Sequence, residues 1–225
     1  MSMNDRTKLL LKDEGLEKLK KAKVIVFGIG GVGGYVCEML VRTGIENITI
    51  VDFDVVSESN LNRQIIALNS TLNISKVDAM QARLLDINPN LKLTKLNIKL
   101  TVENIEQFNL SNYDFVVDCI DMVKSKIALI YFCHKNNINI ISSMGTGNKA
   151  NIPNFKVCDL YQTKYDGLAR VLRHELKKLG VTSHLVVCTD EQPVKADGLG
   201  SVVYYPAMCA CVLSAYVIKQ LTNKN

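Results

Sequence analysis

A glycine-rich loop between a buried strand and a helix is the feature that most constrains the fold of this chain. Residues 23–28, KVIVFG, are an apolar run that ends in glycine, and residues 28–33, GIGGVG, match the pattern G-x-G-x-x-G. In that pattern the first glycine permits a tight turn, the second allows close approach of a phosphate, and the third lets the helix pack on the strand. We therefore expect a loop whose N–H groups and helix dipole attract phosphate oxygens. The glycines assigned to this site are Gly28, Gly30, Gly31 and Gly33.

Strands and helices are predicted to alternate along the first part of the chain. Further strands are predicted at residues 47–52, 113–120 and 138–142, and the alternating pattern of residues 92–98 predicts another. Helical apolar spacing predicts helices at residues 31–43, 74–88 and 123–136. Because such alternation is typical of parallel sheets, we predict an α/β fold. It would be a Rossmann-like, doubly wound, mostly parallel sheet with helices on both faces.

The rest of the chain is predicted to be a less regular C-terminal extension of the same domain. Residues 168–179 form a strongly amphipathic helix, and residues 205–221 form a final helix. Residues 189–200 carry no regular pattern, and irregular segments of this length usually have a function. We predict one domain over residues 1–225, with a nucleotide-binding core at 1–145 and the substrate region from there to the end.

Composition narrows the class of protein. The 27 Lys and Arg against 22 Asp and Glu give a net charge of +5, which permits an anionic partner. Seven cysteines without paired C-x-x-C motifs are typical of free thiols in a reducing compartment rather than of a structural zinc site. The apolar run at residues 207–218 is shorter than the roughly 20 residues that span a membrane. We expect a cytoplasmic protein without stable membrane insertion.

An acidic residue after the second predicted strand fits a nucleotide ribose. Asp52 lies nineteen residues beyond Gly33, the position at which an acidic side chain hydrogen-bonds the ribose hydroxyls. Nicotinamide-dependent dehydrogenases share this loop and this acid. Taken alone, the two features therefore leave an oxidoreductase open.

A further set of polar side chains favours a triphosphate over a nicotinamide. The set comprises Asp54, Asn60, Arg63, Gln64, Lys76 and Asp121. Arg63 and Lys76 would neutralise phosphate charge. Asn60 and Gln64 would hydrogen-bond phosphate or ribose oxygens. Asp121, at the end of the strand predicted for residues 113–120, would hold Mg²⁺, which prefers one or two carboxylates together with phosphate oxygens.

Three members of this set also have a purely structural alternative. Asp54 would serve as a turn or helix cap, and Asp121 would cap the helix at 123–136, because Asp is strongly favoured at caps. Lys76, taken alone, would be a solvated surface lysine. The combination of residues therefore carries the prediction.

The same segments resemble a known superfamily. GIGGVGGYVCEMLVRTGI, VDFDVVSESNLNRQI, Lys76 and VVDCID are similar to the ThiF/MoeB-like ATP-dependent adenylyltransferases, which share the fold of ubiquitin-activating enzymes. The resemblance implies that Asp52 binds ribose and that Asp121 coordinates Mg²⁺. It also implies that Asn60, Arg63 and Lys76 bind the triphosphate. The implied reaction is attack of a substrate carboxylate on the α-phosphate of ATP, with ATP and Mg²⁺ as cofactors and Arg63, Lys76 and Asp121 as catalytic residues.

The second half resembles one family within that superfamily. Residues 159–177 follow the pattern D-x-x-x-T-x-x-D-P-L-A-x-x-x-R-x-x-L-[RK] of the tRNA threonylcarbamoyladenosine dehydratases, except that Gly167 stands where Pro is usual. The resemblance implies a tRNA substrate carrying threonylcarbamoyladenosine, whose threonyl carboxylate is adenylated and then cyclised by the modification's own nitrogen, releasing AMP. An internal nucleophile has a high effective molarity, so no enzyme thioester is required. The resemblance also implies a homodimer, in which Arg6 would reach the partner's phosphates.

A basic helix face and one cysteine bear on the choice of substrate. Arg170, Arg173 and Lys177 are spaced to share one helix face, which would contact tRNA phosphates or simply be solvated. Cys188, expected in a mobile loop, would favour an alternative: an adenylyltransferase that activates the C-terminus of a ubiquitin-like sulfur-carrier protein, with a sulfur-relay or carrier protein as partner. The absence of paired C-x-x-C zinc motifs argues against that alternative. The polar residues predicted to bind a triphosphate argue against a nicotinamide oxidoreductase.

Overall fold

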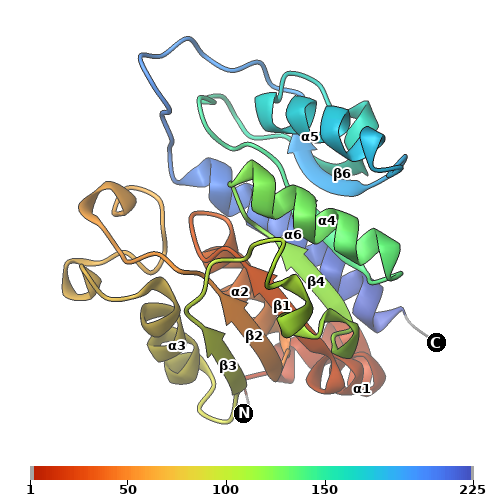
Figure 1. The fold of residues 1–225 in the computed structure, drawn as a ribbon. Helices are drawn as coiled ribbons and strands as arrows, with labels where there is room; N and C mark the ends of the chain where they lie inside the picture. The colour runs from red at the N-terminus through yellow and green to blue at the C-terminus, as the bar shows by residue number, and fades with distance from the viewer. Residues whose placement is uncertain (1–2, 224–225) are drawn as a thin grey trace.

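The computed structural model describes residues 3–223 and contains a seven-stranded sheet between layers of helices (Figure 1). In chain order the strands are β1 (Lys23–Phe27), β2 (Asn47–Val51), β3 (Lys92–Leu96), β4 (Phe115–Asp118), β5 (Ile140–Ser143), β6 (Phe155–Asp159) and β7 (Leu185–Thr189). The α-helices are α1 (Asp5–Lys21), α2 (Gly33–Thr43), α3 (Lys76–Ile87), α4 (Val123–Lys135), α5 (Gly167–Lys178) and α6 (Tyr204–Thr222). Short 3₁₀ turns are η1 (Glu58–Asn60), η2 (Asn69–Thr71), η3 (Ile105–Phe108), η4 (Leu110–Asn112) and η5 (Leu160–Gln162).

The strand order confirms the predicted doubly wound α/β fold. The order is β3-β2-β1-β4-β5-β7-β6, and every pairing is parallel except that of β6 with β7. At the end of β1, Phe27 lies between Val51 of β2 and Asp118 of β4. The chain winds in opposite directions from β1 and β4. In open parallel sheets, ligands bind beyond the carboxyl ends of the strands at such a point.

Helices cover both faces of the sheet, which explains why its central strands are continuous apolar runs. One face packs against α1, α2, α3 and α6, and the other against α4, α5 and η3. Figure 1 shows α4 in front of β4 and α6 behind it. Val24, Val26 and Ile25 of β1 are all fully buried, and each such side chain contributes about 1.5–3 kcal/mol to stability.

The last helix, α6, is held by a stripe of buried side chains. Tyr205, Cys209, Leu213, Val217 and Leu221 recur every four residues and are 0–4% exposed. This spacing puts them on one helix face, which joins the core shared with α2. Within the described residues, no helix is both long and apolar enough to cross a membrane.

One helix was not predicted from the sequence. α1 is interrupted at Lys12, where φ is 62° and ψ is 176°. Its second part buries Leu16 and Leu19, whereas Leu9 and Leu10 in the first part are largely exposed. Because only part of the helix faces the core, its apolar spacing is too irregular to read as one amphipathic helix.

The antiparallel pair β6 and β7 was also not predicted from the sequence. The prediction that Cys188 lies in a loop is therefore wrong. Cys188 does not lie in a mobile loop. It is fully buried in β7, which pairs with β5 on one side and β6 on the other. Its Sγ lies 3.0 Å from the Sγ of Cys158 on β6. The same sheet therefore continues from residues 1–145 into residues 146–225.

Candidate functional site

A cavity of about 1130 Å³ lies beyond the carboxyl ends of the central strands. Most of the predicted site residues line it, namely Gly28, Gly30, Gly31, Asp52, Asp54, Arg63, Gln64, Lys76 and Asp121. Gly33 and Asn60 do not. Pockets for a single small ligand are usually about 300–1,000 Å³, so this cavity has room for a nucleotide and part of a second substrate.

The glycine loop has no room for side chains at two positions. Gly28 has a φ of +84°, and a Cβ there would lie 2.7 Å from the carbonyl oxygen of Cys119. A Cβ on Gly33 would lie 1.7 Å from the carbonyl oxygen of Gly28. Gly33 therefore serves the close packing of α2 on the loop rather than the wall of the cavity. The loop brings the start of α2 and its free N–H groups to the cavity, where they favour an anion.

Asp52 fastens the glycine loop to the end of β2. Its carboxylate accepts hydrogen bonds from the backbone N–H groups of Ile29 (2.6 Å) and Asp54 (2.8 Å). The side chain is 8% exposed and lines the cavity. Each carboxylate oxygen can accept a second hydrogen bond, so a ribose hydroxyl would find a fixed acceptor here.

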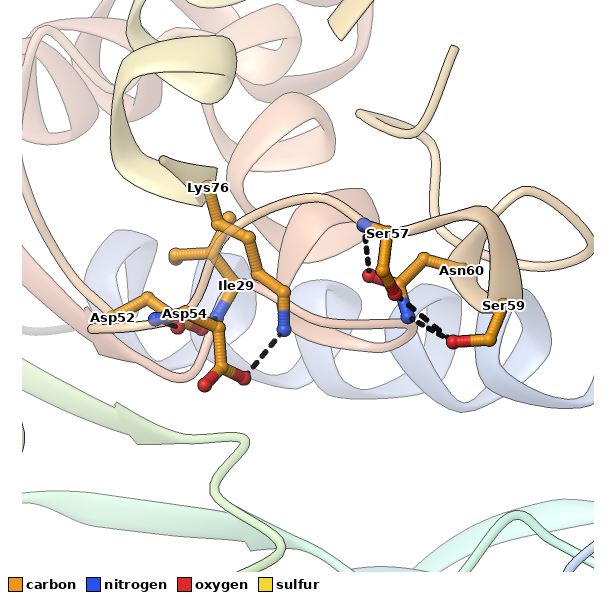
Figure 2. A network of polar contacts seen from close by, with 7 residues as sticks. All are labelled: Ile29, Asp52, Asp54, Ser57, Ser59, Asn60 and Lys76. Carbon is orange, nitrogen blue, oxygen red and sulfur yellow. Dashed lines mark hydrogen bonds and ion pairs between the residues drawn. The ribbon is translucent and has the colours of Figure 1, made fainter. Parts of the chain in front are cut away.

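Lys76 and Asp54 form an ion pair at the cavity wall (Figure 2). Lys76 is the first residue of α3, after the N-cap Ser75, and its Nζ lies 2.8 Å from Asp54 Oδ2. Asp54 therefore balances a buried lysine rather than capping a helix, and Lys76 is only 6% exposed. An incoming phosphate would find the ammonium already aimed at the cavity.

Arg63, Asn60 and Gln64 differ in what they offer a ligand. Arg63 donates to the carbonyl oxygen of Ser59 at 2.8 Å and to Asn62 Oδ1 at 2.9 Å, both through one guanidinium nitrogen. Asn60 is committed to its own turn, where it accepts from the backbone N–H of Ser57 (Figure 2). Gln64 is 6% exposed, and its side-chain oxygen has no hydrogen-bond partner among the described residues. A buried unpaired amide in a cavity wall is costly and fits a ligand that would complete it.

Asp121 does not cap α4, and its carboxylate is open to a ligand in the cavity. The N-cap of α4 is Met122, and within residues 3–223 no protein group hydrogen-bonds the Asp121 carboxylate. The side chain is exposed and lines the cavity. A single free carboxylate suits Mg²⁺, which binds through one or two carboxylates and the phosphates of its nucleotide.

A buried polar chain underlies the loop that carries Asp121. Lys126 and Asp118 are both 0% exposed and form an ion pair at 2.9 Å. Lys126 also donates to the carbonyl oxygen of Ile120 at 2.9 Å, and Asp118 accepts from the N–H of Ile120 at 3.0 Å. Both contacts hold Ile120 in place. The neighbouring Asp121 is therefore presented by a rigid turn.

The chain continues through Ser142 to two histidines. Ser142 Oγ donates to Asp118 at 2.6 Å and lies 2.8 Å from His184 Nε2. Because the hydroxyl proton goes to the carboxylate, His184 Nε2 must be the donor to Ser142. His184 Nδ1 then accepts from His134 Nε2 at 3.1 Å. Burial, with the charges of His134 and Lys126, lowers the pKa of His184 to about 3, so the ring stays neutral.

The opposite wall of the cavity comes from the loop after β5. Gly145 N donates to Asp166 Oδ2 at 2.8 Å, and Asp166 also caps α5 through the N–H of Ala169. Lys149, which sequence reasoning missed, lines the cavity, is 4% exposed and donates to the carbonyl oxygen of Gly145 at 3.0 Å. The signal available in the sequence was a lysine that ends a glycine-containing loop, GTGNK, after a predicted strand.

Asn148 and Glu191 fix the long segment that leads from β7 to α6 (Figure 1, blue). Asn148 Nδ2 donates to the carbonyl oxygen of Gly198 at 3.0 Å, and Asn148 N to that of Gly200 at 2.8 Å. Glu191 accepts from the hydroxyl of Tyr205 and, at 3.1 Å, from Asn151 Nδ2. The irregular segment is therefore tied to the cavity wall.

The predicted basic face of α5 is smaller than expected. Arg170 and Lys177 are exposed, but Arg173 points inward. Its guanidinium donates to Thr163 Oγ1, to the carbonyl oxygen of Thr163 at 3.1 Å and to that of Leu160 at 3.4 Å. Arg173 therefore fastens α5 to η5.

The thiol of Cys188 is not set up as a nucleophile. Burial and the contact with Cys158 raise its pKa to about 12. Reactive cysteines have lowered pKa values and access to solvent. Cys188 has neither property.

Comparison with known proteins agrees with this geometry. The model of the ThiF family matches residues 5–225. The chain is 42% identical over 190 residues to the tRNA threonylcarbamoyladenosine dehydratase of Bacillus subtilis (strain 168), which covers 84% of this chain and 75% of that protein. The E. coli tRNA N6-threonylcarbamoyladenosine dehydratase, solved in complex with ATP, superposes with a TM-score of 0.92 at 33% identity, over 97% of this chain and 93% of that chain. The molybdopterin-synthase adenylyltransferase of Haemophilus influenzae (strain ATCC 51907 / DSM 11121 / KW20 / Rd) is 36% identical over 129 residues, 57% of this chain and 53% of that protein.

Proposed function

The chain belongs to the ThiF family, and we propose that it is an ATP-dependent tRNA threonylcarbamoyladenosine dehydratase. The dehydratase relatives match most of the chain, whereas the molybdopterin-synthase adenylyltransferase matches 57% of it. That difference favours a tRNA substrate over a sulfur-carrier protein. Both readings share adenylation of a carboxylate, and they differ in what carries that carboxylate.

One observation carries the proposal: a single cavity combines a phosphate-binding glycine loop, a ribose acceptor and cations on two walls. Asp52 would bind the ribose, and the loop after Gly28 would bind phosphate oxygens. Arg63 and Lys76 would screen the triphosphate. Because the volume exceeds what one nucleotide needs, an acyl substrate can reach the same cavity.

The chemistry follows from this residue set. A threonyl carboxylate is already ionised at neutral pH, so its attack on the α-phosphate needs no general base. It does bring two anions together. Arg63, Lys76 and the loop N–H groups lower that repulsion and stabilise charge as pyrophosphate leaves. Mg²⁺, when bound, would neutralise phosphate charge, and Asp121 would be its protein ligand.

Ring closure requires no covalent enzyme intermediate. A nucleophile within the modification attacks the acyl adenylate, and AMP leaves with one of the carboxylate oxygens. The net change is loss of one water. The buried Cys188, with its raised pKa, supports a mechanism without an enzyme thioester.

We also propose a homodimer and a tRNA-binding surface on α5. Arg6 lies on α1 and does not line this chain's cavity, which is compatible with a role at a partner's site in a homodimer. Arg170 and Lys177 remain the exposed cations of α5 and would contact tRNA phosphates. A tRNA-modifying enzyme of this kind would act in the cytoplasm. A sulfur-relay partner is the weaker alternative.

The direct test is mass spectrometry of nucleosides from tRNA incubated with the protein, ATP and Mg²⁺, with AMP counted alongside. We expect threonylcarbamoyladenosine to lose the mass of one water, with one AMP formed for each cyclised nucleoside. An unchanged nucleoside, with pyrophosphate exchanged into ATP only when a carrier protein is added, would favour the sulfur-carrier alternative. Stabilisation by NAD and not by ATP would contradict both adenylation readings.

A further inference from the structure

We propose that Lys149 binds the substrate carboxylate and makes the enzyme selective for the threonylcarbamoyl group. This inference rests on the proposed function and assigns a residue to its second substrate. It begins from an unusual placement, a lysine that lines the cavity and is 4% exposed. Buried lysines are almost always paired with a carboxylate.

Lys149 has no such pair. Within residues 3–223, no carboxylate lies within ion-pair distance of its Nζ, and its recorded acceptor is the carbonyl oxygen of Gly145 at 3.0 Å. An ammonium has three donors, so two remain for a ligand. The other buried lysines of this region are paired: Lys76 with Asp54 and Lys126 with Asp118. Lys149 therefore has no carboxylate partner among the described residues and keeps donors free for a ligand in the cavity.

The position of Lys149 favours the acyl substrate over the triphosphate. The glycine loop, Asp52 and Lys76 belong to β1, β2 and the start of α3. Lys149 follows β5, which is two strands from β1 on the opposite side from β2. Neighbouring strands are about 4.8 Å apart, so β5 lies roughly 10 Å across the sheet from the glycine loop. A carboxylate approaching the α-phosphate from that side would pass Lys149.

The loop is also held rigidly enough to aim a charge. Gly145 is fixed on both sides, by the carboxylate of Asp166 on its N–H and by Lys149 on its carbonyl. Asn148, the residue before Lys149, is held by the backbone of Gly198 and Gly200. A preorganised cation in a poorly solvated wall stabilises an anion far more than one in water.

The test compares the affinities of wild type and of Lys149→Met for two RNAs. The RNAs are anticodon stem-loops with threonylcarbamoyladenosine or with plain adenosine, bound in the presence of a non-hydrolysable ATP analogue. We expect wild type to prefer the modified RNA and Lys149→Met to lose that preference by about tenfold to a hundredfold, the range of one charge-assisted hydrogen bond. Affinity for the unmodified RNA and for the ATP analogue should change by less than about twofold. The matched control is Lys23→Met, an exposed lysine at the far end of β1.

Stability gives a second readout that a merely structural lysine would not produce. Lys149→Met removes a buried charge and also the hydrogen bond to the carbonyl oxygen of Gly145, two changes with opposite effects on stability. The melting temperature should therefore change little while the preference for the modified RNA falls. Lys149→Arg, which keeps the charge, should retain more of that preference than Lys149→Met. Should Lys149→Met fail to fold, Lys149→Gln removes the charge with a polar side chain in place and is held to the same expectation.

Three results would overturn the assignment. A full preference for modified RNA in a folded, uncharged variant would show that Lys149 does not contact the carboxylate. An equal loss for both RNAs would assign Lys149 to the RNA backbone, and a parallel loss of ATP-analogue affinity would assign it to the triphosphate. Failure of the proposed function has a different signature, because wild type itself would then neither prefer nor cyclise the modified RNA.

Discussion

Asp121 is the residue on which magnesium dependence should rest. Its carboxylate is exposed in the cavity and is not the cap of α4. We expect Asp121→Asn to raise the Mg²⁺ concentration for half-maximal AMP formation by more than about tenfold, since a charged ligand is worth at least about 1.4 kcal/mol. The control is Asp86→Asn, an exposed position on α3. A magnesium titration curve that coincides with wild type would remove Asp121 from the metal site.

Cys188 offers a test between the two adenylation readings. Because its thiol is fully buried and its pKa is raised to about 12, we expect Cys188→Ala to form AMP and cyclised nucleoside at rates within about twofold of wild type. Alkylation with iodoacetamide should reach the exposed Cys211 well before Cys188. Loss of turnover in a folded Cys188→Ala protein would instead support a thioester route.

Motif and spacing predict which residues lie near the site, as Lys76 and Asp54 show, but not which partners they bind. Motif and spacing placed both residues beside the nucleotide loop, and both line the cavity. The same reasoning did not separate Gln64, whose side-chain oxygen is unpaired, from Asn60, which is committed to its own turn. Such partners depend on local backbone geometry, which periodicity does not specify.

At the scale of elements, the buried chain from Asp118 through Ser142 and His184 to His134 joins β4, β5 and α4 to the residue just before β7. His184 is neutral in the folded protein, with a pKa near 3, and would have its ordinary value near 6.5 when unfolded. Below about pH 6.5 the unfolded state therefore binds the extra proton, and the free energy of unfolding falls as the pH drops. Between about pH 7 and pH 5 this amounts to about 2 kcal/mol.

The prediction is that His184→Gln reduces the acid sensitivity of the fold. Denaturant unfolding at both pH values should show a smaller difference for the variant than for wild type. His174→Gln, at an exposed position on α5, should leave the difference unchanged. An identical pH dependence in His184→Gln and wild type would mean that His184 is not the group responsible.

Helix α5 carries one arginine that is hydrogen-bonded within the fold, Arg173, and two exposed basic residues, Arg170 and Lys177. Arg173 donates to Thr163 and Leu160, so Arg173→Met should cost about 1.5–3 kcal/mol of stability. Arg170→Met and Lys177→Met should leave the melting temperature nearly unchanged. Each should weaken tRNA binding uniformly and reduce the salt slope by about one. A stable Arg173→Met protein with weakened tRNA binding would return Arg173 to the RNA face.

The elements that escaped prediction share a physical cause. Strands β1, β2 and β4 of the nucleotide half are almost wholly buried, so they stand out as apolar runs. β6 is an edge strand with one buried residue, Phe155, and α1 is largely exposed before Lys12. Partial burial weakens the apolar period on which such predictions depend.

At the scale of the whole molecule, the fold lines one cavity with residues from both halves of the chain. The strand order reverses between β1 and β4, which opens a cavity between the nucleotide loop on one side and the loop after β5 on the other. The segment from β7 to α6 is tied to that second loop through Asn148 and Glu191. We therefore expect residues of the first half to hold ATP while the second half presents the substrate carboxylate.

The measurement that tests this account most directly follows one oxygen atom. Modified tRNA labelled with ¹⁸O in both threonyl carboxylate oxygens would be turned over with ATP, and the AMP analysed by mass spectrometry. Attack of the carboxylate on the α-phosphate predicts one labelled oxygen in each AMP, with the other retained in the cyclised nucleoside. Unlabelled AMP alongside cyclised nucleoside, or ADP in place of AMP, would contradict an acyl adenylate.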